Sequence, residues 1–157
     1  MQKILISSCL LGEPVRYDAK GTPLDHELIR LWQAQGRLVA VCPELLGGLP
    51  APRPCCEILG EGGGAAVLAG RARVMGADGS DFTAAFIAGA QMVLELAHTS
   101  GARLAILKER SPSCGSHIIY DGRFASRRIA GSGVTAALLE REGVQVFCED
   151  ELAAVAS

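Results

Sequence analysis

The chain has 157 residues, of which 49% are apolar and only 4% aromatic, and its 15 basic and 17 acidic side chains give a formal net charge of −2. This length is typical of one domain, so we expect residues 1–157 to form a single unit. The absence of a basic excess argues against a protein that grips nucleic acid through its phosphates, and no apolar run reaches the ~20 residues of a membrane span. Too few residues precede Cys9 for a signal peptide, so we expect a cytoplasmic protein.

Short apolar runs alternate with helical patterns along the chain, and glycine or proline separates most of them. A stretch dense in glycine and proline is too long for an ordinary connection and is therefore expected to be a functional loop. Two short segments read as hairpins, one of them around the Asp121-Gly122 pair that favours a tight turn. The predicted elements are, in chain order, a strand at 3–8, a helix at 24–35 capped by Asp25, a strand at 37–41, the functional loop at 43–64, a hairpin at 65–75, a helix from Asp81 to about residue 98, a strand at 103–107, a loop at 108–115, a hairpin at 118–124, a helix at 133–141, a strand at 144–148 and a closing helix at 150–155.

Apolar strands that alternate with helices are typical of a parallel sheet buried on both faces. We therefore predict an α/β fold: a single three-layer, Rossmann-like domain with a mostly parallel sheet, helices on both faces and small β-hairpin insertions. Ligands of such sheets bind beyond the carboxyl ends of the strands.

Three of the six cysteines fall at such strand ends. Cys9 and Cys42 directly follow the first two predicted strands, and Cys114 lies in the loop after the strand that ends at residue 107. Parallel strands would bring these three thiols to one edge of the sheet. Three thiolates suit a zinc ion with an open position or an iron–sulfur cluster with one iron not bound by protein. The alternative is that each is a small buried core residue.

The remaining cysteines carry weaker signals. No CxxC pair occurs in the chain. Cys55 and Cys56 are neighbours whose side chains diverge, so they make a poor chelate and a strained disulfide. We expect Cys148 to pack in the core. Cys114 and His117 have the spacing of half a zinc site, but no matching pair exists, and we expect His117 at a hairpin edge.

Six strings of sequence, taken together, resemble a widespread bacterial family whose characterised members are thiouracil desulfurases. They occur in order over nearly the whole chain: SSCLLG from Ser7, VRYD from Val15, CPELLGGLPAPRP from Cys42, LKERSPSCG from Leu107, YDGRF from Tyr120 and GVTAALL from Gly133. The chain departs from the family's usual residues at Val15 and at the Cys55-Cys56 pair.

The resemblance implies a [4Fe–4S] cluster held by Cys9, Cys42 and Cys114, with an open iron that binds the sulfur of a thiolated pyrimidine. It also implies that Glu44 and Ser111 are active-site groups. The expected reaction is a hydrolytic, non-redox desulfuration of a small thiouracil-type molecule that gives uracil and hydrogen sulfide. Glu44 is expected to move the proton of the attacking water and Ser111 to orient substrate or water.

Two other functions are compatible with the residues. An iron–sulfur enzyme of sulfur transfer on thiolated nucleosides or tRNA would need a local basic patch, for which Arg123, Arg127 and Arg128 are candidates. A non-catalytic zinc or nucleotide-binding module is the other, although no GxGxxG or P-loop string is present. Arg53 and Glu57 could form a structural ion pair or contact the pyrimidine, and the sequence does not distinguish these roles. No feature of the sequence indicates an oligomeric state.

Overall fold

The computed structural model describes residues 1–156, and its centre is a four-stranded parallel sheet in the order β2-β1-β5-β8. The predicted α/β class and the parallel sheet are confirmed. Two antiparallel strand pairs, β3 with β4 and β6 with β7, lie outside the sheet. The elements are β1 Ile4–Ser7, a 3₁₀ turn η1 Ser8–Leu11, α1 Glu27–Ala34, β2 Leu38–Val41, α2 Pro43–Leu46, β3 Cys56–Leu59, α3 Gly63–Leu68, β4 Arg73–Gly76, α4 Thr83–Ser100, β5 Leu104–Leu107, β6 Ile118–Tyr120, β7 Arg128–Ala130, α5 Val134–Arg141, β8 Gln145–Cys148 and α6 Leu152–Ala156.

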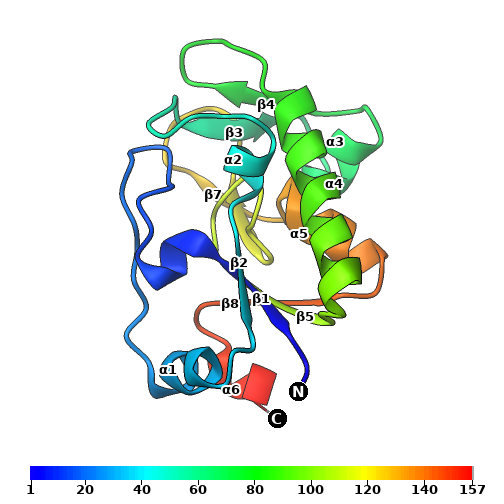
Figure 1. Cartoon of the computed structure of the whole chain (residues 1–157). Coiled ribbons are helices and arrows are strands. Elements are labelled where there is room, and N and C mark those ends of the chain that lie inside the picture. Colours follow the sequence, from blue (N-terminus) through cyan, green and yellow to red (C-terminus); the bar gives the residue numbers. More distant parts are fainter. Residues whose placement is uncertain (157) are drawn as a thin grey trace.

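Helices cover both faces of the central sheet (Figure 1). On one face Leu5 of β1 packs with Val93 of α4 and Leu139 of α5. On the other face the neighbouring Ile4 and Ile6 pack with Trp32 of α1 and with residues of α6. Because successive strand residues point to opposite faces, the apolar residues 4–6 of β1 serve both cores. Among the described residues, no helix is both long and apolar enough to cross a membrane.

The predicted hairpin at 65–75 is wrong. Its first half forms helix α3, and its second half forms β4, which pairs antiparallel with β3 from the long glycine- and proline-rich stretch. A run of a few apolar residues fits a strand or a buried helix equally well, so periodicity alone does not separate them. Residues 43–64, expected as loop, also contain α2.

For the second predicted hairpin, the position of the turn is wrong. β6 pairs with β7, so residues 121–127 form the connection rather than a tight turn at Asp121-Gly122. The cap of α1 also differs, since the His26 side chain rather than Asp25 accepts the Leu28 N–H.

Helix α2 lies unusually close to α4. A Cβ at Gly47 would stand 2.0 Å from the Ala85 carbonyl oxygen, and one at Gly89 would stand 1.9 Å from the Pro43 carbonyl oxygen. Only glycine permits this backbone contact. The contact fixes α2, and with it the residues on either side of Pro43, against the longest helix of the fold.

Candidate functional site

The three cysteines at the strand ends line one cavity of about 520 Å³ at the carboxyl edge of the sheet. Cys9 lies in η1 directly after β1, Cys42 directly follows β2, and Cys114 lies in the loop after β5. β1 pairs in register with both neighbours, Ser7 opposite Val41 and Ile6 opposite Ile106. The strands therefore deliver the three loops to the same level of one edge.

The thiols are close enough to interact electrostatically. Burial, followed by the Glu44 carboxylate, raises the pKa of Cys42 to about 11. Burial and Glu44 also raise the pKa of Cys114 well above its usual value, and Cys9 and Cys42 add to that effect. Packing three thiols and a carboxylate together disfavours negative charge, so a bound cation is what would stabilise the thiolates here.

Two hydroxyl groups lie against this set of thiols. The Ser7 hydroxyl interacts with Cys114 and accepts the Lys108 N–H at 3.0 Å. The Thr22 hydroxyl oxygen is buried and has no well-formed hydrogen bond in the part of the chain described. It lies beside the Cys9 thiol. Burial raises the pKa of Cys9, and the interaction with Thr22 lowers it.

Glu44 lies in the first turn of α2 and is paired with Arg53. The Arg53 Nη2 donates to Glu44 Oε2 at 3.0 Å, and both side chains are nearly buried, with 5% and 13% of their surface exposed. The Cys42 thiol contacts the same oxygen at 3.7 Å. Burial raises the Glu44 pKa, and Arg53 opposes that rise. Both contacts are to Oε2, and Oε1 makes neither of them.

Arg53 is itself fixed by the backbone around the cavity. Its side-chain Nη1 donates to the carbonyl oxygens of Val15 and Pro50, at 3.0 and 3.1 Å. Its backbone N–H donates to the Tyr17 carbonyl oxygen at 2.7 Å. Of the two roles open to Arg53 in the sequence, the structure shows an ion pair, but with Glu44 rather than with Glu57.

Ser111 lines the cavity and holds the loop that carries Cys114. Its Oγ accepts the N–H of Ser113 at 3.1 Å and the N–H of Cys114 at 3.0 Å. A hydroxyl that accepts twice still has its own proton to donate. Behind it, the buried Ser113 and Thr135 hydroxyls are 2.7 Å apart, which ties this loop to the start of α5.

Glu57 fastens a second loop over the cavity. This buried carboxylate accepts the N–H of Gly122 at 2.9 Å and of Phe124 at 3.2 Å through Oε1. Phe124 and Tyr17 both line the cavity and are each 40% exposed, so two aromatic rings stand at its mouth. Arg123, Arg127 and Arg128 are exposed on or next to the same loop.

Cys55 and Cys56 also line the cavity. The sequence did not predict this position, because neighbouring cysteines make a poor chelate for one metal ion. Cys148 is buried as expected, yet it is not merely a core residue, because its thiol lies near Glu109 and His117. His117 thus neighbours Cys148 rather than acting with Cys114. Burial raises the Glu109 pKa, but hydrogen bonds from the N–H groups of His117 and Ile118 outweigh that effect and lower the pKa to about 2.

Comparison with known proteins places the whole arrangement in a family. The profile of 2-thiouracil desulfurase matches residues 4–151. The chain belongs to the 2-thiouracil desulfurase family. It is 47% identical over 149 residues to the uncharacterized protein YbbK of Bacillus subtilis strain 168, covering 95% of this chain and 97% of that one. The solved structure of the [4Fe–4S]-dependent thiouracil desulfidase TudS superposes with a TM-score of 0.91 at 46% identity, over 99% of this chain and 96% of that chain.

For this desulfurase-family chain, the Glu57 contacts generate a prediction about the loop at 121–127. Glu57→Ala leaves two backbone N–H groups without their acceptor, which costs about 1–3 kcal/mol and loosens the loop. We expect a lower midpoint of thermal unfolding and faster proteolysis after Arg123 or Arg127. Glu61→Ala, at an exposed glutamate, is the matched control. Equal proteolysis of the two variants would contradict the role given to Glu57.

Proposed function

We propose that this chain is a [4Fe–4S]-dependent desulfidase that removes sulfur from thiouracil-type pyrimidines by hydrolysis. The observation that carries the proposal is the convergence of Cys9, Cys42 and Cys114 on one cavity beside Glu44. Family membership and the similarity to TudS support the cofactor and the substrate class.

The donor set fits such a cluster. Soft thiolates are the ligands that iron–sulfur clusters use, and the three sulfurs come from three separate loops around a shared space. The Ser7 and Thr22 hydroxyls lie where they can donate to the sulfurs of Cys114 and Cys9. Hydrogen bonds of this kind tune a cluster's potential. Cys9, Cys42 and Cys114 would hold the cluster, which would supply Lewis-acid chemistry toward the thiocarbonyl sulfur.

Glu44 is the residue to which we assign proton transfer. Its Oε1 accepts a proton from the water that attacks the C=S carbon and returns it to the sulfur that leaves. Water adds oxygen to the carbon, and sulfur departs as hydrogen sulfide, so C=S and H₂O become C=O and H₂S with no net redox change. Arg53 holds the other carboxylate oxygen in place throughout.

The remaining cavity residues bind and orient the planar ring. Tyr17 and Phe124 offer aromatic faces at the mouth, where stacking excludes water from the bound pyrimidine. The Ser111 hydroxyl donates its free proton to a ring oxygen or to the attacking water. None of these assignments requires an oxidant or a reductant.

The first test replaces the ligands. Cys9→Ser, Cys42→Ser and Cys114→Ser each remove a soft donor, so each variant is expected to lose most of its iron and sulfide after anaerobic reconstitution. Iron and sulfide counting and the visible absorption measure the loss. Cys55→Ser, at a cavity cysteine to which no ligand role is assigned, is the control and should load fully. Full loading of any of the three ligand variants would refute its assignment.

The second test separates the proton carrier from the cluster. Glu44→Gln keeps an acceptor for Arg53 but cannot take a proton, so kcat for sulfide release from 2-thiouracil should fall about 10²–10⁴-fold. The iron and sulfide content should match that of the unaltered chain. A Glu44→Gln variant that turns over at the original rate would rule out Glu44 as the base.

A thiolated nucleoside within RNA stays the second candidate substrate. The exposed Arg123, Arg127 and Arg128 lie on or next to the loop that contributes Phe124 to the cavity, which is where a polynucleotide backbone would pass.

A further inference from the structure

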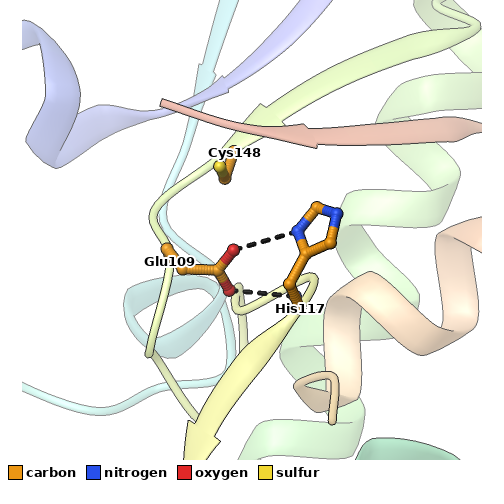
Figure 2. A group of neighbouring side chains, drawn as sticks. All are labelled: Glu109, His117 and Cys148. Carbon is orange, nitrogen blue, oxygen red and sulfur yellow. Dashed lines mark hydrogen bonds and ion pairs between the residues drawn. The ribbon is translucent and has the colours of Figure 1, made fainter. Parts of the chain in front are cut away.

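A second group of metal-ligating side chains lies beside the loop that follows β5, and one member, Glu109, also lines the cavity. Glu109, His117 and Cys148 each present one ligand atom, and these atoms all lie within 4.8 Å of one another. Figure 2 shows the carboxylate facing the imidazole, with the thiol beside the gap between them. The three residues come from the start of a loop, its end and the end of β8, so only the fold unites them.

Each of the three side chains is held in place by its neighbours. Glu109 Oε1 accepts the N–H groups of Ser116, His117 and Ile118 at 2.9 to 3.0 Å. That leaves Oε2 as the oxygen that faces the ring, where His117 Nδ1 lies 3.0 Å away. Cys148 ends a strand of the central sheet and is buried. A site whose donors are already oriented needs little rearrangement to take a ligand.

A set of outer carboxylates supports the same three residues. Glu151 Oε1 accepts the Cys148 N–H at 2.9 Å, and its Oε2 lies 3.7 Å from His117 Nε2. Glu149 accepts the Glu109 N–H at 2.7 Å and pairs with Lys108 at 2.7 Å. A carboxylate behind the second ring nitrogen is the usual outer partner of a metal-bound histidine. Glu151 faces Nε2, whereas Nδ1 contacts the Ser116 hydroxyl at 2.8 Å and the Glu109 carboxylate at 3.0 Å, and a metal bound at Nδ1 would replace the hydrogen of these contacts.

We propose that Glu109, His117 and Cys148 bind a zinc ion, separate from the cysteine-held cofactor. One thiolate, one imidazole and one carboxylate form a mixed donor set that suits zinc, and the thiol gives up its proton when the ion binds. The side chain of His117 is 53% exposed and that of Glu109 is 10% exposed, so an ion can reach the group from solvent on the side of the imidazole.

The ion would fasten both ends of the loop that carries the cavity residues. Glu109 and His117 bracket Ser111 and Cys114, and Cys148 anchors them to β8. Zinc at this place would hold the Cys114 loop rigid at both of its ends. This role does not depend on the reaction proposed for the cavity, because its ligands include none of Cys9, Cys42 and Cys114.

The test is zinc binding by the chain loaded with its cluster, so that the three cavity cysteines are already occupied. We expect one zinc per chain by metal analysis after gel filtration, with an X-ray absorption spectrum that shows one sulfur neighbour and the rest nitrogen or oxygen. Cys148→Ser and His117→Gln should lower zinc affinity more than 100-fold, and Glu151→Gln about 10–100-fold. Cys55→Ser, which alters a cysteine of the cavity, is the control and should bind zinc normally.

A second arm keeps the result independent of the cluster. The triple variant Cys9→Ser, Cys42→Ser and Cys114→Ser should still bind one zinc with the same one-sulfur spectrum, whether or not the unaltered chain takes up iron. Zinc with three sulfur neighbours, or zinc lost in the triple variant but kept in Cys148→Ser, would assign the metal to the cavity and overturn the proposal. Absence of zinc from both the loaded chain and the triple variant would overturn it as well.

Discussion

Parallel pairing of β1 with β2 on one side and β5 on the other determines where the loops of the site begin. Parallel strands in register end together, so Ser7 opposite Val41 and Ile6 opposite Ile106 fix where three loops begin. Cys9 and Cys42 then lie within two residues of a strand end, and Cys114, further along its loop, is held by the Ser111 hydroxyl. A slip of one residue in either ladder would turn the core side chains of that strand to the opposite face and part the thiols.

The anchors beyond the strands are backbone contacts and buried polar pairs. α2 lies against α4 through two glycines, and the Cys114 loop is tied to α5 through Ser113 and Thr135. The nearly buried Glu44–Arg53 pair costs desolvation energy, and its value lies in orienting a carboxylate beside the thiols. Hydrogen bonds also orient the Glu109 carboxylate, which accepts three backbone N–H groups and faces the His117 ring.

Much of this arrangement follows from the sequence because its signals are local. Apolar runs on both sides of helical patterns predicted the sheet, and the strand ends then brought Cys9, Cys42 and Cys114 to one cavity. Three features could not be predicted because they depend on distant partners. Residues of α3 form a helix rather than a strand, Arg53 pairs with Glu44, and Cys148 lies near Glu109 and His117. A short apolar run has no periodicity of its own, and spacing within one segment does not reveal which distant segment packs against it.

The proposed function requires that three thiols hold a four-iron cluster with one iron left open at the cavity. Mössbauer spectroscopy of the ⁵⁷Fe-loaded chain, recorded with and without 2-thiouracil, tests it most directly. We predict four irons per chain, with the spectrum of one changed by the thiopyrimidine and those of the other three preserved. A spectrum that 2-thiouracil leaves entirely unchanged, or a loaded chain that holds no four-iron cluster, would contradict the claim.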